Sequence, residues 1–144
     1  DSIYYQKEYS YNSTSLDSTK GILKYRFLHN AKGDIEFTFK NKLSIGFSVK
    51  YFSKIENMDI VIQDFEELTN QLSYVQDIEY MDYYEAHRYG NCILDARISY
   101  KLNEKHKIAL ISANITNSVY SLRPLKIEQP RTIMLQYTLN LDKN

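Results

Sequence analysis

The ionisable residues with the most suggestive spacing are Asp95 and Arg97, which stand two positions apart. In an extended strand, residues i and i+2 point to the same face, so both charges belong to one side of a sheet. The pair can contact a polar ligand, or it can be an ordinary structural ion pair, and the second interpretation is the simpler one. Alternation farther upstream predicts the same kind of polar strand face for Arg26 and Glu36.

A second group of candidate contacts lies in the acidic, tyrosine-rich stretch 74–89. Tyrosine contributes large contact area in ligand-binding loops at a low entropic cost. His87, beside Glu85 and Arg88, is conceivable as a contact to a metal chelate, although a solvated loop cluster is the simpler interpretation. The candidate ligand contacts are Tyr74, Tyr80, Tyr83, Tyr84, His87, Arg88 and Tyr89.

Residue spacing gives no support for enzymatic chemistry. The single cysteine, Cys92, cannot form an internal disulfide, and a lone thiol on an apolar strand face is more often a small hydrophobe than a nucleophile. The three histidines are scattered without the spacing of zinc ligands. No Ser-His-Asp order, phosphate-binding glycine loop or paired-carboxylate motif stands out. We therefore expect no enzyme, no cofactor and no metal.

Composition narrows the classes of partner. The 144 residues include 18 basic and 18 acidic side chains, so the net charge is zero and nucleic acid is not an expected partner. Mean hydropathy is -0.50, and a membrane helix needs about 20 apolar residues. Barrel strands mix apolar and polar residues, so low hydropathy leaves a membrane possible. The 14 tyrosines suit strands and bilayer interfaces.

Alternation of apolar and polar residues predicts five strands. The last, 131–141, carries apolar residues at its odd positions from 133 and mostly polar ones at even positions. Similar alternation occupies 22–40, 43–52, 93–102 and 108–119. A period of two gives each strand one apolar and one polar face. Soluble strands usually have about 5–6 residues, whereas transmembrane strands need about 9–11.

The connections between these strands alternate between short and long. Residues 41–42 and 103–106 read as short polar turns, whereas 53–91 and 121–130 are long, and 60–72 fits a short helix. Outer-membrane barrels have short periplasmic turns and long extracellular loops. The pattern predicts an all-β, antiparallel transmembrane β-barrel, with the long loop outside the cell.

Four motifs follow one another between residues 93 and 131. They are Ile93-Leu-Asp-Ala-Arg-Ile-Ser-Tyr-Lys-Leu102, Ile108-Ala-Leu-Ile-Ser-Ala-Asn-Ile-Thr-Asn117, Tyr120-Ser-Leu-Arg-Pro124 and Gln129-Pro-Arg131. This succession resembles the C-terminal end of TonB-dependent outer-membrane receptors of Bacteroidetes-type bacteria, whose last tip reads Pro-Pro-Arg. The segments Lys24-Tyr-Arg-Phe27 and 51–59 resemble the preceding hairpin of that family.

The resemblance implies that the chain is the C-terminal part of one barrel domain with roughly 22 strands. Within it we expect a loop or edge at 1–21, a strand hairpin at 22–52, an extracellular loop at 53–91 and the last three strands at 92–141. Such a receptor imports a nutrient across the bacterial outer membrane, for example a ferric siderophore, haem, cobalamin, a glycan or a peptide. The lumen-facing candidates are then Asp95, Arg97, Arg26 and Glu36.

The implied partners are the rest of the barrel and its plug, in the same or a separate chain. Further implied partners are the TonB energising complex, which acts through the plug, and the lipids of the outer membrane. A surface lipoprotein is a possible additional partner. Neither a plug domain nor a TonB-contacting segment is recognisable in this sequence. Whether the chain is a fragment, a proteolytic product or a split subunit stays open, as does the transported substrate.

The alternative interpretation is a soluble β-sandwich or lipocalin-like module that binds a ligand with its tyrosine-rich loops. The two interpretations differ in what covers the apolar strand face, which is lipid in a barrel and a dry protein core in a sandwich. In the barrel interpretation, about five strands leave two unpaired edges, which lipid cannot satisfy. We therefore expect that the chain cannot close a barrel by itself.

Overall fold

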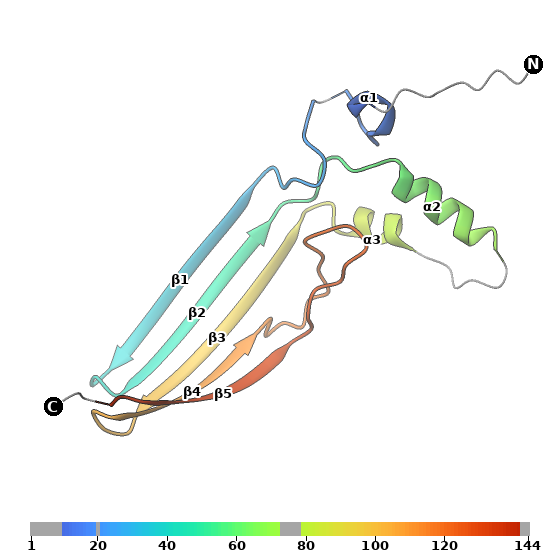
Figure 1. Ribbon diagram of the computed structural model, residues 1–144. Helices are drawn as coiled ribbons and strands as arrows, with labels where there is room; N and C mark the ends of the chain where they lie inside the picture. Colours follow the sequence, from blue (N-terminus) through green and yellow to red (C-terminus); the bar gives the residue numbers. More distant parts are fainter. Residues whose placement is uncertain (1–9, 20, 73–78, 142–144) are drawn as a thin grey trace, which may run out of the picture. The chain divides into compact units, whose positions relative to one another are not determined.

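One antiparallel sheet of five strands dominates the structure, which is a computed structural model describing residues 10–19, 21–72 and 79–141. The strands pair in sequence order, each with the next, as Figure 1 shows. Within the described residues, β1 and β5 do not pair with each other, so the sheet is open. The expectation of a mostly β, antiparallel fold is thus confirmed. The strands are β1 (Asn30–Phe39), β2 (Leu43–Phe52), β3 (Asn91–Lys101), β4 (His106–Ala113) and β5 (Thr132–Leu139).

The chain divides into two compact units. The residues before Asn30, together with Ser53–Gly90, form unit 1, and the sheet with its turns forms unit 2. The described residues of unit 1 include the helices α1 (Tyr11–Thr14), α2 (Val61–Asn70) and α3 (Tyr80–Ala86). The helix expected within 60–72 is confirmed as α2. None of the helices in the described ranges has the length and apolar character required to cross a bilayer.

The expected strand 22–40 is wrong over its first eight residues, because β1 begins at Asn30. Tyr25 adopts a φ of +61°, a left-handed conformation that a strand cannot contain. Its backbone N–H donates to the Asn57 carbonyl over 2.8 Å, which draws the segment into unit 1. Before β1, the only strand bridge in this segment among the described residues is an isolated antiparallel one between Phe27 and Ile55.

The expected strand 108–119 is also too long, since β4 ends at Ala113. Asn114 has a φ of +51°, and its backbone N–H donates to the Asp95 carboxylate over 2.9 Å. Asn117 is left-handed as well, with a φ of +54°. Asparagine tolerates this conformation better than other residues with a Cβ. The two asparagines of the Asn-x-x-Asn motif therefore turn the chain out of the ladder.

The first hairpin turn lies one residue earlier than expected. Lys40 and Asn41, with φ of +47° and +54°, take the central positions, and Lys42 N–H donates to the Phe39 carbonyl over 3.0 Å. Positive φ at both central residues gives the twist that antiparallel strands need. The second short turn lies where expected. There the Asn103 side chain accepts hydrogen bonds from the backbone N–H groups of residues 105 and 106.

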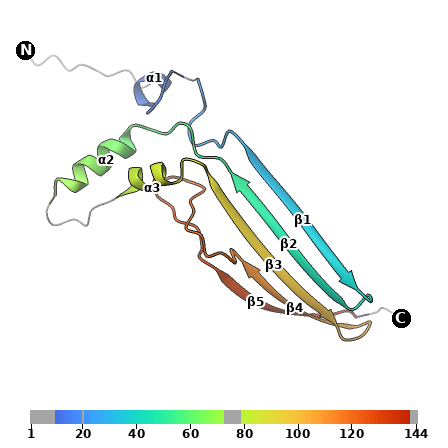
Figure 2. The same ribbon diagram turned by 180° about the vertical axis from the view of Figure 1, so that it is seen from behind.

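Strand register places most apolar residues of the five strands on one face, with Ile93, Ile111 and Met134 on the other. Phe37 pairs with Ile45, which pairs with Ile98. Ile98 pairs with Leu110, which pairs with Leu135. Because side chains opposite each other in a ladder share a face, these five form a continuous apolar row across the sheet. Figure 2 shows the strands side by side from behind.

Unit 1 has a small core of its own. Met58 is fully buried, and it packs with Ile62 of α2 and Tyr80 of α3. Side chains packed against these three are Leu16, Met81, Tyr83 and Tyr84. The residue pattern of the stretch 74–89 does not predict α3. The helix is seen only in the structure, where its side chains pack in this core.

Replacing the central methionine tests this core. Met58→Ala should lower the free energy of unfolding of unit 1 by about 2–5 kcal/mol, because it removes a fully buried side chain and leaves a cavity. Hydrogen exchange of the α2 and α3 amides measures the loss. Val61→Ala, at an exposed position of α2, is the matched control and should change exchange little.

Candidate functional site

The apolar face of the sheet is exposed over its whole width. Leu43, Ile45 and Leu94 of this face are partly buried, but Leu135 is 76% exposed, and the other exposed large apolar side chains of the face are between 37% and 65% exposed. Their combined exposed area is on the order of 1,000 Å², above the few hundred Å² of the usual largest patch on a soluble monomer. These residues are Ile35, Phe37, Phe39, Phe47, Val49, Tyr51, Ile98, Tyr100, Ile108, Leu110, Ile133, Leu135, Tyr137 and Leu139.

Tyrosines lie at both ends of this face. Tyr100 and Tyr137 belong to the row nearest the short turns, because Leu43 pairs with Tyr100, Tyr100 with Ile108 and Ile108 with Tyr137. Tyr51 lies eight residues farther along β2, which is roughly 27 Å at the usual rise per residue. Aromatic residues bordering an apolar band are typical of surfaces that meet a bilayer.

The opposite face carries charges that pair across strands. Arg97 of β3 donates from Nε and Nη2 to one carboxylate oxygen of Glu36 on β1, over 2.9 and 2.6 Å. To reach β1 it passes over Gly46 of β2, the residue between them in the register. A Cβ at Gly46 would lie 2.6 Å from Arg97 Nε, so a larger residue there would require the Arg97 side chain to shift.

Asp95 forms the second ionic link on this face. Its Oδ2 accepts from Lys50 Nζ of β2 over 2.7 Å, and its Oδ1 accepts from the Asn114 backbone N–H. Nearby, Ser48 donates to Asp34 of β1. Asp95 therefore ties β3 both to β2 and to the point where β4 ends.

Three of the four lumen-facing candidates share this polar face, namely Glu36, Asp95 and Arg97. The expectation that Asp95 and Arg97 pair with each other is wrong, because each takes a partner on another strand. Residues i and i+2 of a strand are nearly 7 Å apart along it, whereas cross-strand neighbours lie about 5 Å apart. Arg26 lies outside β1 and is an exposed residue of unit 1.

The loop candidates are mostly occupied by packing within unit 1. Tyr80 is buried in the core, and burial raises its pKa to about 12, so it does not present its hydroxyl to a ligand. Tyr83 stacks on Tyr80 and on His87, with ring centroids 6.1 and 4.1 Å apart. The Tyr84 hydroxyl donates to the Ile55 carbonyl, and burial raises its pKa.

Two loop candidates remain on the surface. Tyr89 is 77% exposed, and the Arg88 guanidinium lies 4.8 Å from its ring centroid. Tyr74 lies outside the described residues. Among the residues described, no group of three or more His, Cys, Asp or Glu side chains is arranged to hold a metal ion.

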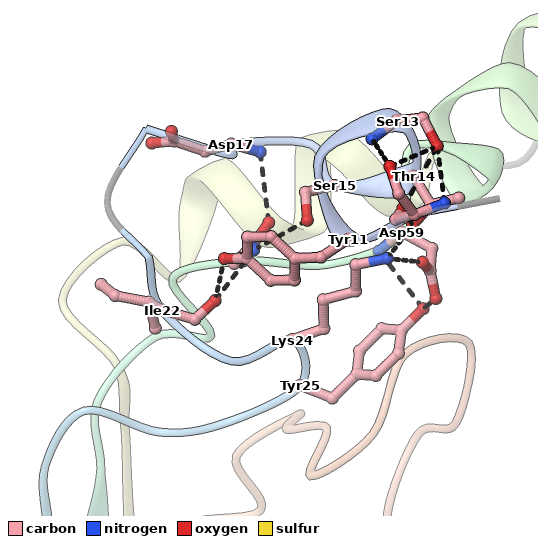
Figure 3. Close-up of polar contacts among 11 residues, drawn as sticks. Tyr11, Ser13, Thr14, Ser15, Asp17, Ile22, Lys24, Tyr25 and Asp59 are labelled. Carbon is pink, nitrogen blue, oxygen red and sulfur yellow. Dashed lines mark hydrogen bonds and ion pairs between the residues drawn. The ribbon is translucent and has the colours of Figure 1, made fainter. Parts of the chain in front are cut away.

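Sequence reasoning missed a polar network that joins the segment 10–25 to 57–59. Asn57, 1% exposed, donates from Nδ2 to the Tyr11 hydroxyl and to the Ile22 carbonyl, both over 3.0 Å. Lys24 donates to Asp59, and the Tyr25 hydroxyl donates to the same carboxylate, as Figure 3 shows. The contacts join residues more than 30 positions apart, so no local motif signals them.

The Asp59 carboxylate makes unit 1 sensitive to acid. Its hydrogen bonds from Lys24 and then from Tyr25 hold its pKa below the ordinary value of 3.8. A pKa that is lower in the folded chain contributes stability above the unfolded value, and this stability is lost as the pH falls through the folded pKa. Amide protection near residues 24–25 and 57–59 should therefore decrease below pH 3.8. Asp59→Asn should remove this pH dependence, and an unchanged acid response in that variant would contradict the assignment.

Gly46 provides a test of the Glu36–Arg97 pair. Gly46→Ala should destabilise the sheet by about 1 kcal/mol, since it displaces Arg97 from a half-exposed ion pair. In an Arg97→Ala background the same change should be neutral or stabilising, because alanine has less conformational entropy to lose on folding. Denaturant unfolding in detergent measures this double-mutant cycle. An equal cost of Gly46→Ala in both backgrounds would show that Arg97 is not the obstacle.

Comparison with known proteins gives no relative, because no family model, no curated protein and no solved structure matches the chain. Function is therefore inferred from the geometry of the sheet and from the residue pattern.

Proposed function

We propose that the sheet is part of the wall of a bacterial outer-membrane β-barrel, within a TonB-dependent receptor that imports a nutrient. The observation that carries this proposal is the pair of unlike faces. An exposed apolar face crosses all five strands, and the opposite face holds charges that pair with one another. A barrel wall has this division, with lipid outside and a polar lumen inside.

Strand length supports a lipid-facing sheet. β1, β2 and β3 have 10, 10 and 11 residues. Ten residues span roughly 34 Å, and a tilt of about 40° leaves a height of roughly 26 Å, close to the apolar band of about 25 Å in outer-membrane barrels. β4 and β5, with 8 residues each, are shorter, but the apolar positions continue past β5 at the exposed Leu141.

Contact with lipid would remove the free-energy cost of exposing the apolar face of the sheet to water. Removing a fully exposed Leu, Ile or Phe side chain from water lowers the free energy by roughly 1.5–3 kcal/mol. Many such side chains on this face are about half exposed, so each would contribute about half of that amount. On the other face, the ion pairs of Glu36 with Arg97 and of Lys50 with Asp95 leave little unpaired charge. Such pairs are compatible with a water-filled lumen or with contact to a plug.

The open edges define the nearest partners. β1 and β5 each have one neighbouring strand, and an unpaired edge is not tolerated in lipid. Further strands of the barrel, from the same chain or from another, would pair with them. In the receptor proposal a plug fills the lumen and contacts the TonB complex, and a surface lipoprotein is a further candidate partner. The substrate is one of the nutrient classes that such receptors import.

The motifs that carry the resemblance hold the sheet and its long connection together in this structure, as a structural motif of a barrel wall would. Asp95 and Arg97 supply the two ionic links of the polar face. Asn114 ends β4, and the Asn117 side chain accepts from the Arg131 backbone N–H over 2.9 Å, directly before β5. The asparagines thus hold the long connection at both of its ends.

Charge substitutions on the two faces of β5 test lipid contact. Leu135→Arg should cost roughly 2–4 kcal/mol if the residue lies near the bilayer midplane, and Gln136→Arg, on the other face, should cost far less. On a surface that stays in water, the 76% exposed Leu135 would tolerate the same change. The amount of folded protein in the outer-membrane fraction of the producing cells measures the difference.

Equal tolerance of Leu135→Arg and Gln136→Arg would exclude a lipid-facing sheet. Preparations in detergent-free buffer provide a second discriminator. A soluble monomer that melts cooperatively there would contradict the barrel wall and favour the β-sandwich or lipocalin-like module, in which protein covers the apolar face.

A further inference from the structure

Unit 1 contains an open hollow of about 440 Å³ beside α1. Its volume lies within the range of small-molecule sites, about 300–1,000 Å³. Two cationic side chains, three hydroxyl-bearing residues and one leucine line it. These are Lys24, Arg26, Ser10, Tyr11, Thr14 and Leu23.

Lys24 is held in a fixed position at this hollow. Its Nζ donates to Thr14 Oγ1 and to Asp59 Oδ1, as Figure 3 shows. The same nitrogen lies 5.9 Å from the centroid of the Tyr11 ring. An ammonium group has three N–H donors, so these two bonds leave one for a ligand.

Through its guanidinium, Arg26 gives the hollow a positive charge that no described residue neutralises. It is exposed, and its guanidinium makes no hydrogen bond or ion pair with any residue in the described part of the chain. Asp59 offsets the charge of Lys24 and is itself bonded to the Tyr25 hydroxyl. Counting the described residues that line it, the hollow therefore has a net positive charge and the five N–H donors of one guanidinium.

The walls of the hollow are fixed by hydrogen bonds within the chain. Thr14 Oγ1 donates to the Ser10 carbonyl over 2.7 Å, and the Tyr11 hydroxyl donates to the Ile22 carbonyl over 2.5 Å. With its hydroxyl occupied, the Tyr11 ring forms an apolar wall together with Leu23. The part of the site formed by Thr14, Tyr11 and Lys24 therefore requires little ordering when a ligand binds, whereas the exposed Arg26 side chain becomes ordered on binding.

We propose that this hollow binds an organic anion of monosaccharide size through a phosphate or carboxylate group. The anionic group takes the N–H fork of Arg26 and the remaining N–H of Lys24, and the carbon skeleton lies against Tyr11 and Leu23. The hollow, at about 440 Å³, is larger than the roughly 30 Å³ of one water, so there is room for a carbon skeleton beside the anionic group. This site belongs to unit 1, so it does not depend on lipid contact of the sheet.

The test is a titration of the 144-residue chain in a non-ionic detergent, followed by NMR. Glucose 6-phosphate and glucuronate are the probes, and the tighter one identifies the preferred anionic group. Either should shift the Arg26 Nε–H and Tyr11 signals saturably, with glucose and inorganic phosphate at least about tenfold weaker. Arg26→Gln should weaken binding about tenfold, and Arg26→Lys less, because lysine keeps the charge without the fork.

Arg123→Gln is the matched control, since it removes the same charge from an exposed arginine of unit 2. It should leave the affinity unchanged. Thermal melts confirm that Arg26→Gln is folded, as expected for an exposed side chain without partners. The absence of saturable shifts at millimolar probe, equal affinity of Arg26→Gln and the unaltered chain, or equally tight binding of inorganic phosphate would each overturn the proposal.

Discussion

The pairing of β2 with β3 is the interaction on which the rest of the sheet depends. It joins two hairpins that are separated along the chain by the second half of unit 1, and Leu43 meets Tyr100 at one end while Phe52 meets Asn91 at the other. A slip of one residue would move every apolar side chain of one hairpin to the wrong face. The bonds that prevent this slip are on the polar face. Lys50 binds Asp95 across the junction, and Arg97 spans it to reach Glu36.

Gly46 shows how closely sequence and register are coupled at this junction. The strand pattern at 43–52 would accept a small polar residue there, because its neighbours on that face are Ser44 and Ser48. The crossing of Arg97 disfavours a side chain there, since a Cβ would also lie 2.9 Å from Arg97 Cγ and Arg97 would have to move. The observed geometry of the ion pair therefore depends on glycine at position 46 and on this register.

The two units are stabilised in different ways. Unit 1 has a small core around Met58 and a polar network around Asn57, so its contacts are largely satisfied within the chain. The sheet has strand hydrogen bonds and ion pairs, but its apolar face covers no core in the described residues. Among the described strand residues, the one buried large apolar side chain is Ile93, which lies on the polar face opposite Lys50. A sheet with this surface is stable when something apolar covers it, which is why the proposed function assigns lipid to that face.

The sequence by itself determined the strands and their faces, because alternation with a period of two is a local property that needs no partner. It placed β2 and β3 to within one or two residues, predicted α2 from apolar spacing, and put Glu36, Asp95 and Arg97 on a polar face. Tertiary structure decided where the strands begin and end. Tyr25 is drawn to Asn57 and Asp59, and Asn114 to Asp95, so the strands expected there end early. It also decided that Arg97 binds Glu36 rather than Asp95, that Tyr80 is a core residue, and that Arg26 lies at a hollow instead of on the sheet. These outcomes depend on residues far apart in the chain, whose proximity no local pattern encodes.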